Sequence, residues 1–226
     1  MVLPIIITKT LSGESQARQV TIYAQTIEES SEKTLRTIKG YTPKQNWATG
    51  PKTTKLIDLL SIVRSFEIRG YIATEDNVTT LNENLTATDT TITVASGTAI
   101  SNILKVVSSS HPAYIQIGDE LIKFTGISGN DLTGCTRGWG YTTASTHSTG
   151  DEIKIPAFCF KEYLRYIIEA GGVATLYYLG NPADDNRSVT YSVNFKKWSI
   201  REEATDDLIA SSYNVIIQVV EGEDIG

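Results

Sequence analysis

The side chains best able to bind a metal are few and far apart in this sequence. The 226 residues include two histidines, His111 and His147, and two cysteines, Cys135 and Cys159. A zinc site takes three or four ligands, usually at short spacings along the chain, and no such grouping surrounds these residues. Two cysteines are also too few for a disulfide framework. We therefore predict no metal site, and we interpret both cysteines as semi-buried thiols that act as small apolar residues.

Carboxylates are the other candidates for catalysis. Asp184-Asp185 and Asp206-Asp207 are acidic pairs, but each lies in a polar stretch typical of a solvated turn and offers too few oxygen ligands for calcium. The sequence also lacks the G-x-S-x-G nucleophile elbow, the Walker A phosphate loop and the G-x-G-x-x-G dinucleotide fingerprint. These observations predict no catalytic residue and no cofactor site, and so a protein that is not an enzyme.

The charge balance limits the possible partners. The chain has 20 basic and 26 acidic residues, a net charge of -6, and its lysine clusters are short and isolated. A protein that grips DNA through phosphates needs a basic face, so we expect no specific nucleic-acid binding. No apolar run approaches the ~20 residues of a membrane-spanning helix, and the first residues lack the basic region of a secretory signal. We expect no membrane association, and synthesis in a reducing cytoplasm.

The elements that would position these residues are mostly strands. Val, Ile, Thr and Tyr recur in alternation, which is typical of a pleated, half-buried surface. The run 18–24 alternates, and the run 62–72 does so more clearly. In the second run Arg64 interrupts the apolar face, and Gly70 indicates a bulge or a close backbone approach. The predicted apolar face of this run consists of Ile62, Phe66, Ile68 and Ile72.

One helix is expected in the last third of the chain. Over residues 156–170 apolar side chains recur at helical spacing, and Gly171-Gly172 then supplies a left-handed cap. Strands are predicted to follow over 173–179, 189–195 and 213–220. The helix should lie on a core through a stripe made of Phe160, Leu164, Ile167 and Ile168.

A polar, turn-rich connection is predicted from about residue 28 to residue 55. It contains two glycines and two prolines, and Trp47 stands alone within it. A connection of this length is uncommon in a compact domain unless it has a function or packs on a neighbour. Two interpretations stay open. It is an arm that reaches an adjacent subunit with Trp47 as its anchor, or a surface loop that Trp47 pins to its own core.

The middle of the chain differs in composition and suggests an inserted module. Residues 77–155 are rich in Thr, Ser and Gly, with short alternating runs between tight turns. The runs 113–117 and 120–125 flank Gly118-Asp119, which is a hairpin signal. We predict a mainly β protein. Residues 1–76 and 156–226 would form a discontinuous β-sandwich or barrel core with one flanking α-helix, and 77–155 an inserted small all-β domain.

Three submotifs in this middle segment resemble a β-module that recurs in structural proteins of tailed phages and related viruses. In that module an Ile-Gly-Asp-Glu hairpin is followed by Gly-Cys-x-Arg-Gly and then by Ala-x-x-His-x-x-Gly. The resemblance covers about a third of the chain. Within it we interpret His147 as a structural hydrogen-bonding residue. The matching stretches here are Ile117-Gly118-Asp119-Glu120, Gly134-Cys135-Thr136-Arg137-Gly138, and Ala144 with His147 and Gly150.

The flanks resemble small tail proteins of contractile and siphophage-like particles. This likeness is carried by the run 56–72, the helix ending in Gly171-Gly172 and the closing stretch 213–224. Tail-tube and baseplate ring proteins of that kind pair a β-sandwich or barrel with one flanking helix and stack as rings, commonly hexameric, around a DNA channel. The resemblance implies a homo-oligomeric ring with other tail proteins as partners, located in the virion tail after assembly in the host cytoplasm. The predicted interface residues are Trp47, Phe66, Arg69, Tyr71 and Trp139.

The sequence therefore favours a structural virion protein that assembles into a tube, baseplate or adaptor ring of a viral tail. Edge strands of one subunit would pair with the next, and an acidic channel lining would let DNA slide. Two alternatives stay open. Segment 79–155 with Trp139 would bind a carbohydrate or a receptor, or a tail-associated hydrolase would use an acid pair drawn from Asp184, Asp185 and Glu152.

Overall fold

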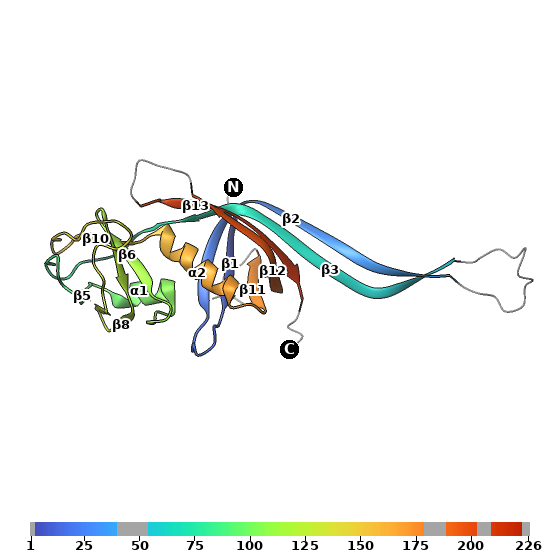
Figure 1. The fold of residues 1–226 in the computed structure, drawn as a ribbon, viewed down its shortest axis with the longest axis horizontal. Coiled ribbons are helices and arrows are strands. Elements are labelled where there is room, and N and C mark those ends of the chain that lie inside the picture. Colours follow the sequence, from blue (N-terminus) through green and yellow to red (C-terminus); the bar gives the residue numbers. More distant parts are fainter. Residues whose placement is uncertain (1–2, 40–53, 179–188, 203–208, 223–226) are drawn as a thin grey trace, which may run out of the picture.

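The computed structural model describes residues 3–39, 54–178, 189–202 and 209–222. They form a barrel, a module beside it and a two-stranded ribbon that projects on the side away from the module (Figure 1). The barrel is closed in the order β1-β11-β12-β13-β3-β2, with every neighbouring pair antiparallel. The predicted mainly β class is confirmed. The barrel strands are β1 (Leu3–Lys9), β2 (Arg18–Lys39), β3 (Thr54–Ala73), β11 (Ala174–Tyr178), β12 (Val189–Arg201) and β13 (Ser212–Glu221).

Strand alternation fills the barrel with aliphatic side chains. Successive residues of a strand point to opposite faces, so every second residue reaches the core. The face predicted for 62–72 is buried at Phe66, Ile68 and Ile72 but not at Ile62, which is 59% exposed. Ile62 lies on the same strand face as Phe66, Ile68 and Ile72. It lies beyond the end of the barrel, however, so no core covers it.

The predicted helix is confirmed as α2 (Ala157–Glu169). It packs against β2, β3 and β13. Of the predicted stripe, Phe160, Leu164 and Ile167 are buried, and Ile168 is partly buried. Gly171 and Gly172 follow with φ of 61° and 68°, the left-handed conformation that glycine adopts without steric cost.

The ribbon corrects the prediction of an irregular connection from residue 28 to residue 55, which is wrong over its described part. β1 pairs with β2 as far as Ala24, and β13 pairs with β3 from Ser65 onward. Beyond these residues each of the two strands has the other as its one described partner. At about 3.3 Å per residue, the 22 residues of β2 extend roughly 70 Å. We define the ribbon as residues 25–39 and 54–64; residues 40–53, with Trp47, lie outside the described chain.

Gly70 sits where the ribbon leaves the barrel. The register of β2 against β3 shifts between Ala24 and Thr26, so Gln25 is an extra residue in β2. A Cβ on Gly70 would lie 2.3 Å from the carbonyl oxygen of Tyr23, a distance that real Cβ contacts do not reach. Both the bulge and the close backbone approach that Gly70 predicted are therefore present. A bulge bends its strand and increases the local twist, which sets the direction of the ribbon.

The module occupies the chain between β3 and α2. It holds a four-stranded sheet in the order β4-β10-β6-β7 and a three-stranded sheet in the order β5-β9-β8. The predicted hairpin is confirmed as β6 and β7 around Gly118-Asp119. The expectation of an all-β module is wrong in one respect, since it contains the helix α1 (Gly97–Leu104), whose first turn is capped by Ser96. The remaining bounds are β4 (Glu75–Thr80), β5 (Ile92–Thr93), β6 (Ala113–Ile117), β7 (Glu120–Phe124), β8 (Gly126–Ser128), β9 (Asp131–Thr133) and β10 (Glu152–Ile155).

A buried arginine joins the module to the barrel. Arg18, at the start of β2, is 0% exposed and donates to both carboxylate oxygens of Glu14 at 2.6–3.2 Å. Its guanidinium lies 4.6 Å from the ring centre of Tyr163 on α2, a cation–π contact. The hydroxyl of Tyr163 in turn donates to the backbone oxygen of Val106 in the module at 2.6 Å. This chain of contacts links the barrel to the module through α2.

Candidate functional site

The module contains one charged cluster that is closed to solvent. The carboxylate of Glu120 on β7 is bound on both oxygens by the guanidinium of Arg137, with both distances 2.8 Å. His147 Nε2 lies 2.8 Å from the same carboxylate. Glu120 is 1% exposed, and the side chains of Arg137 and His147 are also buried.

Backbone groups complete the cluster and tie distant loops together. The amides of Gly138 and Ser145 donate to Glu120 at 2.9 and 3.1 Å. Arg137 also donates to the backbone oxygens of Thr86 and Ser145. The loops around residues 86, 138 and 145 therefore meet at one carboxylate. We call Glu120, Arg137 and His147 the module lock.

The electrostatics of the lock follow from these contacts. Burial by itself raises the pKa of Glu120, but the hydrogen bonds from Arg137, His147 and the two amides outweigh it and lower the pKa to about 2. Glu120 therefore stays ionised at neutral pH, and its charge balances that of Arg137. A paired and fully hydrogen-bonded charge inside a small module suits a structural role, which agrees with our interpretation of His147.

The predicted interface residues near the barrel do not form one surface. Phe66 is 1% exposed and packs on the ring of Tyr191 at 4.7 Å, so this prediction is corrected: strand alternation turns Phe66 inward and leaves it no surface to offer. Arg69 points outward and is paired with Glu67. Tyr71 is half-buried and stacks on Tyr23 at 5.4 Å.

Two tryptophans, Trp139 and Trp47, were predicted as interface residues. Trp139 is half-buried against Tyr114, with the Lys123 ammonium 4.2 Å from its ring centre, so it packs within its own module. Trp47 lies outside the described residues. In contrast to the half-buried Trp139, the next aromatic residue along the chain, Tyr141, is 99% exposed.

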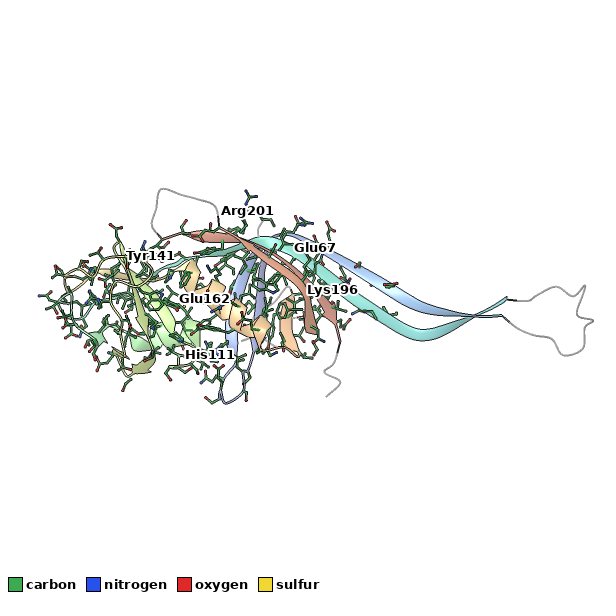
Figure 2. The ribbon with its side chains drawn as sticks, in the orientation of Figure 1. Glu67, His111, Tyr141, Glu162, Lys196 and Arg201 are labelled. Carbon is green, nitrogen blue, oxygen red and sulfur yellow. The ribbon has the colours of Figure 1, made fainter. Side chains whose placement is uncertain are left out.

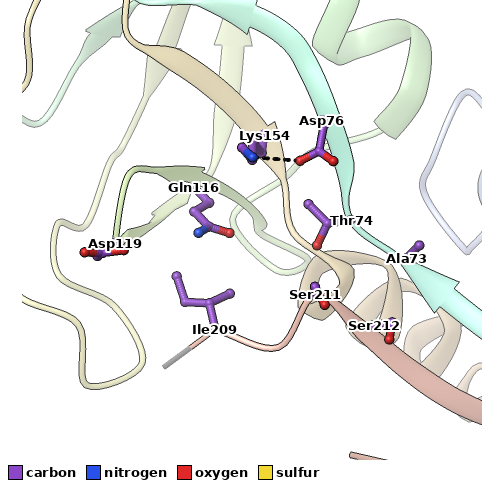
Figure 3. Close-up of a pocket in the computed structure, with 9 residues that line it drawn as sticks. All are labelled: Ala73, Thr74, Asp76, Gln116, Asp119, Lys154, Ile209, Ser211 and Ser212. Atoms are coloured by element: carbon purple, nitrogen blue, oxygen red, sulfur yellow. Dashed lines mark ion pairs between the residues drawn. The ribbon is translucent and has the colours of Figure 1, made fainter. Parts of the chain in front are cut away.

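A hollow of about 520 Å³ lies where β3 passes into β4 beside the start of β13 (Figure 3). Two of its charged groups pair with each other, since Lys154 Nζ lies 2.9 Å from Asp76 Oδ1. The hydrogen bond with Asp76 raises the pKa of Lys154, which keeps the amine protonated. Thr74 receives a hydrogen bond from the amide of Ala157 at 3.0 Å and donates its own amide to Ser211 at 2.9 Å. We interpret this hollow as a structural seam between module and barrel.

Metal and thiol chemistry find no support in the described residues. No three His, Cys, Asp or Glu side chains there gather closely enough to hold a metal ion. Cys135 and Cys159 are free and buried, and burial raises the pKa of their thiols to about 11 and about 12. Such thiols stay protonated and unreactive, as their interpretation as apolar residues predicted. No described helix combines the length and the apolar character that crossing a membrane requires.

Several exposed residues that the sequence interpretation missed lie on the barrel side. Ile62 and Val63 are exposed neighbours on the ribbon, and Trp198 on β12 is 39% exposed. Ile62 belongs to the alternating apolar residues of the run 62–72. That alternation shows which residues share a strand face, but it does not show whether a core covers that face. Trp198 falls just past the predicted strand 189–195, so nothing in the sequence singled it out.

Comparison with known proteins adds no relative. No protein-family model matches the chain, and no curated protein matches it either. The function must therefore be argued from the geometry and from the resemblance carried by the module motifs.

Proposed function

We propose that this chain is a non-enzymatic structural protein of a viral tail, whose copies assemble as rings around the DNA channel. The observation that carries the proposal is the ribbon, which leaves the barrel and extends far beyond it (Figure 1). The resemblance of the module to virion proteins supplies the viral setting, with the tail as its location after assembly in the host cytoplasm.

The ribbon needs a partner for physical reasons. Two strands without a third strand or a hydrophobic face are marginally stable in water. Ile62 and Val63 are exposed on it, and both its outer strand edges run past the last described barrel pairing. An exposed edge with apolar side chains is a template for pairing with another chain. A neighbouring copy that covers the ribbon removes this hazard and orders the strands.

Repetition of that contact produces a closed assembly. A ribbon of one copy that meets a different surface of the next is a head-to-tail contact, which closes into a ring when the rotation per subunit allows. A hexamer is the stoichiometry that the family resemblance implies. The net charge of -6 favours passage of DNA without binding, because like charges repel.

The module is suited to a separate task on the same particle. Its lock holds the loops internally and uses no residue of the ribbon. The module also lies on the side of the barrel away from the ribbon (Figure 1). We propose that it projects from the ring, where other tail proteins reach it without disturbing the channel.

Electron microscopy of the purified protein with light scattering tests this proposal. We expect rings or tubes with an axial hole, tubes favouring a repeating tail-tube protein and single rings a baseplate or adaptor. A control variant that replaces residues 30–64 by a short turn should stay folded and monomeric. A wild-type monomer of 24.8 kDa at every concentration would contradict the proposal.

A receptor- or carbohydrate-binding module is the second candidate, and Tyr141 is the observation that favours it. This residue is 99% exposed and has a φ of 72°, rare for a residue other than glycine. Thr142 anchors the loop by donating to the backbone oxygen of Trp139 at 2.8 Å. A glycan array separates the two candidates: binding that Tyr141→Ala abolishes supports this one, and no sugar preference supports the ring protein alone.

A further inference from the structure

The last residues of β12 have one strand edge that no described strand pairs with. β11 pairs with β12 from Val189 to Val193, whereas β13 pairs with it as far as Arg201. After the register shift that follows Phe195, residues 197–201 have β13 as their one described partner. Alternate residues of such a strand direct their N–H and C=O groups away from the paired side. In the described chain no other strand meets these groups.

The side chains along this edge are basic and apolar. Lys196, Lys197 and Arg201 are exposed, and Figure 2 shows Lys196 and Arg201 at the two ends of the stretch. Trp198 pairs across from Ile217 and is 39% exposed. A partner strand should therefore offer carboxylates along an extended backbone.

A hollow of about 370 Å³ lies beside Trp198, between β12 and α2. Its lining includes Lys161 and Arg165 from α2 as well as the acids Glu162 and Glu202. Glu162 is already engaged, since its carboxylate lies 2.5 Å from Arg165. The apolar ring of Trp198 with this hollow gives a partner side chain a place to insert, as edge-binding segments commonly require.

A strand of that chemistry exists at the base of the ribbon. Residues 25–33 of β2 follow Ala24, the last residue that pairs with β1, so their outer edge is free of a described partner strand. This stretch holds three exposed acids, Glu28, Glu29 and Glu32, against one base, Lys33. Within one molecule β12 and β2 cannot meet, because two strands separate them in either direction around the barrel.

We infer that residues 196–201 of β12 in one copy pair with residues 25–33 of β2 in the next copy. This inference rests on the proposed ring assembly and names the two surfaces that make its contact. Main-chain hydrogen bonds join the two edges, opposite charges face each other across the ladder, and Trp198 becomes covered. The two surfaces are different, so the contact is head-to-tail and compatible with a closed ring.

Zero-length carbodiimide cross-linking of the assembled protein tests the inference directly. Assemblies grown from a mixture of ¹⁵N-labelled and unlabelled protein should give cross-links between Lys196 or Lys197 and Glu28, Glu29 or Glu32. Products that join a labelled to an unlabelled peptide should be among them, which proves that the cross-link lies between copies. Rings without these cross-links would overturn the inference and leave the proposed function standing. A protein that never assembles would overturn both.

Charge reversal gives a second, independent test. The variant K196E/K197E/R201E should raise the concentration needed for assembly at least about tenfold, since three attractive pairs become repulsive. The variant E28K/E29K/E32K should do the same, and a mixture of the two should assemble through the heterologous contact between them. Lys105→Glu, an exposed reversal on the module, is the control and should change nothing. Unchanged assembly of both triple variants would contradict the inference.

Discussion

The inserted module and the ribbon differ in what supports their backbone. In the module the strands β5, β8 and β9 have two or three residues each, yet a buried carboxylate joins the surrounding loops. The ribbon is formed by the outer parts of β2 and β3, strands of 22 and 20 residues that pair in a long ladder, and the described side chains at its base are mostly exposed. Long regular strands therefore do not mark the part of this molecule that has the most interior side-chain contacts.

This difference predicts where a single substitution does most harm. Glu120→Gln removes the negative charge from the lock and leaves the buried Arg137 without a charged partner. Breaking a buried pair in this way costs about 3–5 kcal/mol. Urea unfolding followed by circular dichroism should show that loss in the free energy of unfolding. Glu28→Gln on the exposed ribbon is the matched control, and a loss below about 1 kcal/mol for Glu120→Gln would contradict the role of the lock.

Acid should act on the module through the same residue. The pKa of Glu120 is lowered to about 2, below the roughly 4.3 of an unfolded glutamate. The unfolded chain therefore binds more protons between these values, and stability falls as the pH falls from about 4.3 to 2. Urea midpoints measured at pH 6, 4 and 3 should decrease in that order. Glu120→Gln should show a smaller decrease, and equal slopes for both proteins would show that other carboxylates are responsible.

The base of the ribbon should respond less strongly than the lock. Gly70→Ala places a Cβ 2.3 Å from the carbonyl oxygen of Tyr23, so the two strands must move apart. Overpacking of this kind costs about 1–3 kcal/mol. Thermal unfolding should show a lower midpoint for Gly70→Ala. Gly222→Ala is the control, because among the described residues its added Cβ would meet only Asn194, at an ordinary 3.5 Å.

The free ribbon should be the least sensitive of the three regions. Ile62→Thr alters a side chain that is 59% exposed, so the free energy of unfolding of the monomer should change by less than about 0.5 kcal/mol. The same variant should weaken assembly, because the proposed ring would cover this face. Light scattering at several concentrations separates the two effects. A large loss of monomer stability would mean that Ile62 already packs within its own chain.

Local patterns predicted much of the fold. The turn residues Gly118-Asp119 and the alternation on either side were enough for the β6–β7 hairpin. The helical spacing of Phe160, Leu164 and Ile167 was enough for α2. In each case the signal lies within one short stretch of chain. The hairpin strands are adjacent in sequence, and the helix needs only an apolar core to pack against.

The ribbon and the lock were beyond such reasoning for different reasons. Residues 28–39 are polar enough to resemble a loop, and they form a strand because β3 pairs with them across a connection of many residues. Glu120, Arg137 and His147 each belong to a different submotif of the resemblance, and a structural role was predicted for His147. It did not show that these three side chains meet at one carboxylate.

The sequence by itself determined which residues alternate, where the hairpin turn and the helix fall, and that the chain is mainly β. Those properties depend on backbone sterics and on periodicity, which act between near neighbours. The tertiary structure decided which apolar face is covered, which carboxylate is buried and which strand edges stay open. Phe66 and Ile62 share one strand face, but the first lies inside the closed barrel and the second beyond it. Burial depends on what the rest of the chain brings alongside, and no local pattern contains that information.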